Sequence, residues 1–227
     1  MNIKKAVILV SGGADSATVL SIAKNAGYQL HALSFNYGQK HKAELENAAK
    51  LAAINGASHK IIHIDPSLFS TSALASKDIL VPKYSSKEQI SQDVPVTYVP
   101  ARNNLFLSYA LSYAECNQAF DIFIGVHADD FHNYPDCRPE FIKQFQILAN
   151  YATATAQPIS IHSPLLYLNK TQIIAKGLEL GTNYANTISC YDPNEMDESC
   201  AHCLACHVRL QAFRENDIVD PIKYRKI

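Results

Sequence analysis

The sequence predicts a doubly wound α/β fold, in which helices cover both faces of a parallel β-sheet. Short, uninterrupted apolar runs alternate with segments of helical periodicity along most of the 227 residues. Strands without polar alternation are buried on both faces, which is typical of a parallel sheet wrapped by helices. A glycine turn at residues 11–16 follows the first apolar run, and such folds bind ligands at that position.

The N-terminal part of the chain predicts three strands and two helices. Residues 5–10, KAVILV, form a continuous apolar strand, and residues 14–25 place apolar side chains at helical spacing before Gly27 ends the helix. The same order then repeats, with a strand at 29–38, a helix at 41–55 and a strand at 59–64.

Residues 66–97 lack a strong period. They are interpreted as an insertion or lid, with a solvated loop as the alternative.

The rhythm returns in the second half of the chain. The predicted elements are a helix at 103–116, a strand at 121–126, a helix at 138–155, a strand within 157–165 and a helix at 169–181. From residue 182 the chain is rich in cysteine and shows no further strand rhythm. We therefore expect an α/β domain over 1–181 and a small C-terminal metal-binding appendage over 182–227.

Composition limits the classes of function. The chain carries 20 basic and 21 acidic side chains, so its overall field gives no reason to expect a nucleic-acid partner. No run approaches the ~20 apolar residues of a membrane span, and no signal-peptide pattern opens the sequence. We expect a cytoplasmic protein without a membrane partner.

The turn at residues 11–16, SGGADS, suits a phosphate group. Two glycines let the backbone approach an anion, and the amides of the following helix N-terminus point their positive charge at it. The alternative is a tight turn in which Asp15 or Ser16 caps the helix. The turn lacks the lysine of a Walker loop and differs from a dinucleotide fingerprint. The expected nucleotide-binding residues are Val10, Ser11, Gly12, Gly13, Ala14, Asp15 and Ser16.

The S-G-G-x-D-S order after the first strand resembles the PP-loop ATP pyrophosphatase superfamily. This resemblance implies an adenine nucleotide alpha hydrolase-like fold that holds the phosphates of ATP and activates a carbonyl or carboxyl oxygen. Asp15 beside a polyphosphate would repel it, so Mg²⁺ is expected to accompany the ATP.

A second polar cluster follows the strand at 121–126. Residues 127–138 combine acids, imidazoles, a phenol and a guanidinium at a strand's carboxyl end, which favours contacts to a small substrate rich in hydrogen-bonding groups. Arg138 could pair with a carboxylate, and Asp130 or Asp136 could accept from an amino-heterocycle. Arg102 begins another helix and could bind phosphate oxygens, although a surface salt bridge is the simpler interpretation.

Together these segments resemble the 7-cyano-7-deazaguanine synthase family of queuosine precursor synthesis. The resemblance is carried by segments spread along the chain, at 11–16, 35–41, 99–108, 125–141, 163–173 and 189–206. It implies ATP-dependent conversion of 7-carboxy-7-deazaguanine and ammonia to the nitrile, through an activated carboxylate and an amide. It also implies a homodimer.

The resemblance assigns roles to individual residues. It makes Asp15, Ser16, Arg102 and Lys170 the catalytic residues, acting by charge and alignment. The expected substrate-binding residues are Asp130, Tyr134, Asp136 and Arg138.

Four cysteines form a C-x9-C-x2-C-x2-C pattern at Cys190, Cys200, Cys203 and Cys206. Four thiolates at such spacing are typical of one structural Zn²⁺, and the family carries the same four ligands. An iron–sulfur cluster is the alternative, because cluster-binding runs also use C-x2-C-x2-C. A redox role is disfavoured, since the context is not thioredoxin-like.

The chain departs from the family pattern at four positions. The family usually has glycine at Ala201, aspartate at Asn36, asparagine at His127 and tryptophan at Ile188. The glycine loss raises the question whether the turn after Cys200 needs a positive φ.

Two other functions are alternatives. One is a related PP-loop enzyme, such as a tRNA thiolase or an amide-forming synthetase. The other is a non-catalytic zinc module that binds nucleic acid or protein, which would leave residues 11–16 unexplained.

Overall fold

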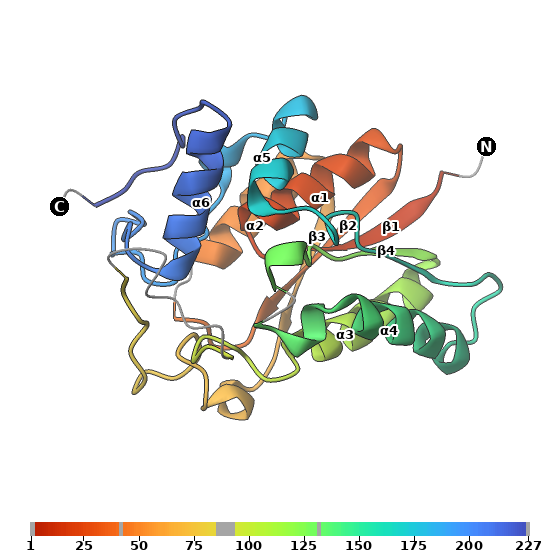
Figure 1. Ribbon diagram of the computed structural model, residues 1–227. Coiled ribbons are helices and arrows are strands. Elements are labelled where there is room, and N and C mark those ends of the chain that lie inside the picture. The colour runs from red at the N-terminus through yellow and green to blue at the C-terminus, as the bar shows by residue number, and fades with distance from the viewer. Residues whose placement is uncertain (1–2, 41–42, 85–93, 131–132, 226–227) are drawn as a thin grey trace.

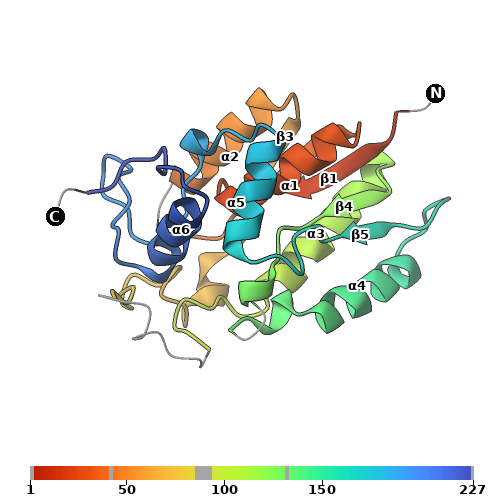
Figure 2. The same cartoon turned by 45° about the horizontal axis from the view of Figure 1, so that its top comes forward.

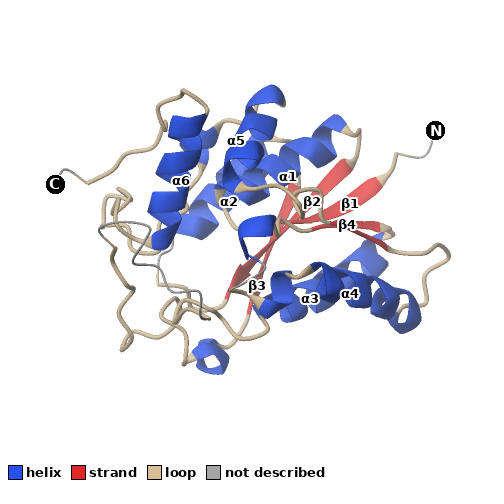
Figure 3. Ribbon diagram, in the orientation of Figure 1, coloured by secondary structure: helices blue, strands red, loops and turns tan. Residues whose placement is uncertain are grey.

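The computed structural model of the protein describes residues 3–40, 43–84, 94–130 and 133–225. Its centre is a five-stranded, fully parallel sheet in the order β3-β2-β1-β4-β5. The strands are β1 (Lys5–Leu9), β2 (Gln29–Asn36), β3 (Ser58–His63), β4 (Asp121–Phe123) and β5 (Ser160–His162). Figure 3 shows the strands side by side in red between two groups of helices. The predicted doubly wound α/β fold is confirmed.

Helices cover both faces of this sheet (Figures 1 and 2). One face carries α1 (Ala14–Asn25), α2 (Ala43–Ile54) and α5 (Lys170–Glu179). The other carries α3 (Arg102–Asn117) and α4 (Pro139–Ala152). All five helices were predicted to within a few residues.

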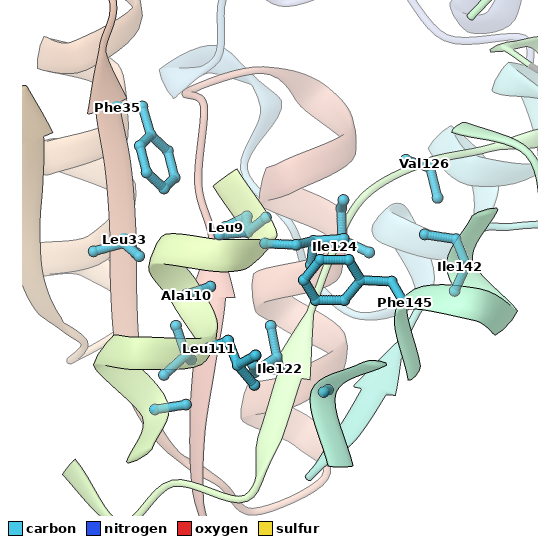
Figure 4. Packing of buried hydrophobic residues seen from close by; sticks show 14 of the residues in the cluster. Leu9, Leu33, Phe35, Ala110, Leu111, Ile122, Ile124, Val126, Ile142 and Phe145 are labelled. Atoms are coloured by element: carbon cyan, nitrogen blue, oxygen red, sulfur yellow. The ribbon is translucent and has the colours of Figure 1, made fainter. Parts of the chain in front are cut away.

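The continuous apolar sequence of β1 serves both cores. Ala6 and Ile8 pack beneath α1 and α2, whereas Val7 and Leu9 face the opposite core. Since side chains alternate across a strand, only a strand that is apolar at every position can fill both layers. Figure 4 shows the second core, where Leu9 and Ile122 of the sheet meet Leu111 of α3 and other residues of α3 and α4.

Strands end earlier than the sequence predicted. Pairing in β4 stops at Phe123 rather than at residue 126, and β2 ends at Asn36 rather than at residue 38, whereas β5 lies within the segment 157–165 as expected. The apolar residues that follow β4, including Ile124 and Val126, are still buried in the second core. An apolar sequence indicates that residues are buried, but it does not show that they pair as a strand. The predicted length of β4 was therefore too great.

A sixth helix, α6 (Leu204–Glu215), was not predicted. It lies in the cysteine-rich region, and its Ala212 and Phe213 pack on Ala14 of α1 and Ile174 of α5. Arg209 of α6 is 1% exposed, and its guanidinium contacts both carboxylate oxygens of Asp220 at 2.7 and 3.0 Å. The C-terminal segment is thereby tied to the helical layer.

The described part of residues 66–97 holds a short 3-10 helix at Pro66–Phe69 and irregular chain. Phe69 and Ala73 are buried, and Leu74 and Thr97 reach the central cavity described below. The remainder of the predicted insertion, 85–93, lies outside the described residues. Among the described residues no helix has the length and apolar character needed to cross a membrane.

Candidate active site and cysteine cluster

Residues 11–16 join β1 to α1 in a compact turn at the carboxyl edge of the sheet. The Gly13 amide donates to Ser11 Oγ at 3.3 Å, and Ser16 Oγ donates to the Gly13 carbonyl at 3.0 Å. No side chain caps the N-terminus of α1. The capping alternative considered for Asp15 and Ser16 is therefore not what the structure shows, and the helix amides keep an anion-binding character.

Gly12 fixes the position of this turn against α2. Its φ is +86°, and a Cβ placed there would lie 2.2 Å from the carbonyl oxygen of Glu44. Only glycine combines this backbone conformation with so close an approach.

A charged cluster stands beside the turn. The Lys170 ammonium, at the start of α5, contacts both carboxylate oxygens of Asp15 at 2.6 Å. His127 Nε2 lies 3.6 Å from Asp15 Oδ2 and 3.4 Å from Asp130 Oδ2. The structure thus joins three elements that the sequence treated separately: the turn after β1, the loop after β4 and the start of α5.

The cluster shifts the pKa values of its members. Burial alone would raise the pKa of Asp15, but the Lys170 ammonium and the His127 ring together hold it well below its usual range. Burial and Lys170 lower the pKa of His127, yet the carboxylates of Asp15 and Asp130 outweigh them and the net shift is upward. The pKa of Asp130 is raised, chiefly by burial.

Arg102 opens α3 and points its guanidinium at the end of β2. Its Nη1 donates to the Tyr37 hydroxyl at 3.1 Å, and its Cζ lies 5.7 Å from the Tyr37 ring centroid and 5.8 Å from that of Phe106. The alternative of a surface salt bridge does not describe this half-buried, aromatic setting. Because Arg102 remains charged at all relevant pH values, the cavity retains a fixed positive group here.

The carboxylate of Asp136 makes a structural hydrogen bond. Its Oδ2 accepts from the Asn103 amide at 2.8 Å and so caps the N-terminus of α3. Tyr134, from the same loop, places its hydroxyl 3.5 Å from Thr97 Oγ1.

These groups surround one cavity of about 330 Å³, within the size range of small-molecule sites. Most of the predicted site residues line it: Val10, Ser11, Gly13, Asp15, Ser16, Arg102, Asp130, Tyr134, Asp136 and Lys170. Three do not. Gly12 faces α2, Ala14 is 1% exposed, and Arg138 is exposed to solvent at the start of α4.

Sequence reasoning missed Glu44 as a cavity residue. It lies half-buried in the first turn of α2 and lines the cavity. Burial raises the pKa of its carboxyl to about 7, against the opposing effect of Arg102. An acid in the first turn of a helix normally stabilises the helix dipole, so nothing in the sequence distinguished Glu44 from its exposed neighbour Glu46.

The four predicted cysteine ligands form a single cluster. Cys190, Cys200, Cys203 and Cys206 are buried, and their sulfur atoms all lie within 4.8 Å of one another. A tetrahedral ZnS₄ site with Zn–S bonds of ~2.3 Å requires sulfur separations of about 3.8 Å, and Cys200 and Cys206 lie 4.0 Å apart. Backbone amides of Cys200 and Asp192 donate to Cys190 Sγ at 3.2 and 3.3 Å, which stabilises thiolate charge. The cluster can hold a metal ion.

The structure answers two questions raised by the departures from the family pattern. Ala201 adopts a φ of +65°, so the turn between the second and third ligands does require the left-handed region. Asn36 Oδ1 accepts from the Gly38 amide at 3.3 Å and shapes the turn after β2. His202 lies between Cys200 and Cys203 in the sequence and could compete for a metal, but it is exposed and belongs to no metal-binding group among the described residues.

One short segment, residues 187–191, touches both the cavity and the cysteine cluster. The Ile188 amide donates to the Gly12 carbonyl at 2.9 Å, and the Tyr191 amide donates to Cys203 Sγ at 3.5 Å. Three neighbours of Cys190 in the sequence line the cavity, namely Ile188, Ser189 and Tyr191. Arg209 holds the other end of the segment through Thr187 Oγ1 at 2.8 Å.

Comparisons with known proteins agree with the fold and show the family. The chain matches the model of the family described as "Queuosine biosynthesis protein QueC" over residues 5–217. It is 59% identical to the 7-cyano-7-deazaguanine synthase of Rickettsia felis, over 97% of this chain and 99% of that protein. It is 57% identical to the protein of the same name from Rickettsia akari, again over 97% and 99% of the two chains.

A solved structure from Methanocaldococcus jannaschii, titled as a predicted subunit of tRNA methyltransferase, shares the fold. Its TM-score is 0.51 at 19% identity, covering 99% of this chain and 93% of that chain. The family match and the identities to curated relatives show that the chain belongs to the QueC family, the 7-cyano-7-deazaguanine synthases.

Proposed function

We propose that the protein is an ATP-dependent carbon–nitrogen ligase that converts 7-carboxy-7-deazaguanine and ammonia to 7-cyano-7-deazaguanine for queuosine synthesis. One observation carries the proposal. The uncapped turn at residues 11–16, called the phosphate turn below, lies around the same cavity as the Asp15–Lys170 pair and Arg102. The names of the relatives supply the substrate class.

The phosphate turn would hold the ATP phosphates. Ser11, Gly13 and the uncapped amides of α1 offer hydrogen-bond donors, and Lys170 and Arg102 offer positive charge. Asp15 and Ser16 would hold a Mg²⁺ ion, which shields the phosphate charge when bound. Their oxygen donors suit this hard cation, and the low pKa of Asp15 keeps its carboxyl ionised.

The remaining cavity would hold the carboxylate substrate. A carboxylate oxygen is a poor leaving group, so it must first become an acyl adenylate. Ammonia then forms the amide, and a second activation of the amide oxygen permits its loss to give the nitrile. The residues act by aligning phosphorus and carboxylate and by neutralising charge on the departing pyrophosphate.

Asp130 and Tyr134 are proposed to contact the deazaguanine, because both line the cavity from the loop after β4. Asp136 and Arg138, the other two predicted contacts, would act from the edge of that loop. Because the Asp136 carboxylate accepts from the Asn103 amide at the start of α3, we expect Asp136 to position the loop after β4 and not to contact the substrate directly.

The cysteine cluster would hold one structural Zn²⁺. All four donors are thiolate sulfurs in a buried, closed arrangement, as structural zinc prefers. We treat residues 1–181 as the nucleotide-binding domain and 182–227 as a zinc-binding segment packed on it. A reducing cytoplasm, which keeps the thiols available, and a homodimer complete the proposal.

The deciding assay incubates zinc-replete protein with Mg-ATP, ammonium and 7-carboxy-7-deazaguanine and follows product by mass spectrometry. We expect the nitrile, preceded by the amide, together with AMP and pyrophosphate. A folded, metal-loaded sample that gives neither amide nor nitrile would refute the proposal. Metal analysis of the same sample separates zinc from an iron–sulfur cluster.

A further inference from the structure

The carboxyl group of Glu44 lies in the cavity, and the mechanism above gives it no task. Glu44 projects from the first turn of α2 and lines the cavity beside the phosphate turn, because the Gly12 backbone lies directly against the Glu44 carbonyl. Among the described residues, the charged and titratable groups that act on it are Arg102 at the start of α3 and Tyr37 at the end of β2.

The other acids of the cavity are already engaged. Both oxygens of Asp15 contact Lys170 at 2.6 Å. Asp129 accepts from the Lys170 amide at 2.9 Å, and Asp136 accepts from Asn103 at 2.8 Å. Asp130 stands 3.4 Å from His127. Taking up a proton would weaken each of these contacts, because the negative charge of the carboxylate strengthens the interactions that it accepts.

Amide formation requires a group that accepts a proton. Neutral ammonia attacks the carbonyl carbon of the acyl adenylate, and the nitrogen then bears one proton too many. The C–O bond to AMP breaks with its electron pair leaving on the phosphate, and a separate base must take the proton from nitrogen while that bond is still intact. Glu44 lines the same cavity as the turn at residues 11–16, and the activated carbonyl must lie in that cavity.

We propose that Glu44 is the general base of the amide-forming step, an inference that rests on the function proposed above. As the C–N bond forms, the ammonia nitrogen transfers its excess proton to the Glu44 carboxylate. AMP departs, and the protonated Glu44 returns the proton to water before the second activation. The positive charge of Arg102 favours the ionised form of Glu44 between cycles.

The protonation behaviour of Glu44 supports this role. Burial raises the pKa of Glu44 to about 7, against the opposing charge of Arg102. A base is most effective when its pKa lies near the working pH. Glu44 is then ionised and able to accept above about pH 7 and protonated below it.

The test separates activation from amide formation. Glu44→Gln preserves size and hydrogen bonding but cannot accept the proton. We expect it to keep substrate-dependent ATP–pyrophosphate exchange within about twofold while amide formation at pH 7 falls roughly 10²- to 10⁴-fold. Glu46→Gln is the matched control, because Glu46 is exposed in the same helical turn, and both rates should stay at the wild-type level.

The pH profile distinguishes a base from a structural group. With rates expressed per concentration of free ammonia, the wild type should lose amide formation below about pH 7, and Glu44→Gln should lose this dependence. Glu44→Asp should retain part of the rate and the pH dependence, and it replaces the glutamine variant if that one fails to fold.

Wild-type amide formation in Glu44→Gln, or equal losses of exchange and amide formation, would overturn the inference. A wild type that makes neither amide nor nitrile would instead refute the proposed function.

Discussion

Replacing Gly12 with alanine should damage the protein at two levels that can be measured separately. An L-residue in the left-handed region costs roughly 1–2 kcal/mol. In addition, the new Cβ would lie 2.2 Å from the Glu44 carbonyl oxygen and 3.0 Å from the Ala48 amide nitrogen. Both atoms belong to helix backbone, so α2 or the turn must move. Overpacking of this kind costs about 1–3 kcal/mol, giving a total loss of about 2–5 kcal/mol.

Gly27 provides a matched control. Its φ of +81° is nearly that of Gly12, but a Cβ there would meet nothing within 4 Å. Gly27→Ala should therefore show only the conformational cost of about 1–2 kcal/mol. The difference between the two variants isolates the close approach of α2.

Urea unfolding monitored by circular dichroism gives both free energies, and nucleotide titration gives the functional effect. Gly12→Ala should unfold at lower urea than Gly27→Ala and bind ATP more weakly, whereas Gly27→Ala should bind ATP normally. Equal stability losses in the two variants, or unchanged ATP affinity in Gly12→Ala, would refute the reasoning that the turn is held in place by its contact with α2.

Three further predictions concern the metal and charged sites. Cys190→Ser should release zinc and destabilise the fold, whereas His202→Ala should do neither; metal content by mass spectrometry and thermal melts check this, and zinc loss in the histidine variant would contradict it. Because Lys170 and His127 lower the pKa of Asp15, the Asp15–Lys170 pair should stabilise the protein above about pH 4 and lose this contribution as the pH falls. A double-mutant cycle with Asp15→Asn and Lys170→Met should give a coupling of about 0.5–3 kcal/mol at pH 7 that shrinks toward pH 3, and a pH-independent coupling would count against it. Ala201→Gly should raise stability by about 0.5–1 kcal/mol, since relief of roughly 1–2 kcal/mol of left-handed strain exceeds the added freedom of the unfolded chain; Ala53→Gly, at an exposed position of α2, should do the opposite in the same urea assay.

The layered fold could be predicted because burial on both faces leaves a direct trace in the sequence. Residues 5–10 are apolar at every position, and the structure fills both cores with them. The end of a strand leaves no such trace, since Ile124 is buried outside β4. Helix α6 was missed although Leu204, Val208 and Ala212 recur at helical spacing, because Cys203 and Cys206 were interpreted only as ligands.

Some features of the site could likewise be predicted from local sequence, whereas others could not. Local motifs predicted a phosphate-binding turn at residues 11–16, and cysteine spacing predicted a four-sulfur cluster that the structure brings together. Contacts between distant segments were beyond the sequence alone. The pairing of Lys170 with Asp15, the capping of α3 by Asp136 and the burial of Glu44 each depend on how separate elements pack.

The hydrogen bond from Ile188 to Gly12 has a consequence for synthesis on the ribosome. The phosphate turn leaves the exit tunnel long before residue 188, whose amide donates to the Gly12 carbonyl and closes the turn. At about 5–20 residues per second, on the order of ten seconds or more separate the two events. Nascent chains stalled before residue 188 would carry the complete SGGADS turn without its cover. Competence to bind ATP should therefore arise only after residue 188 has left the exit tunnel.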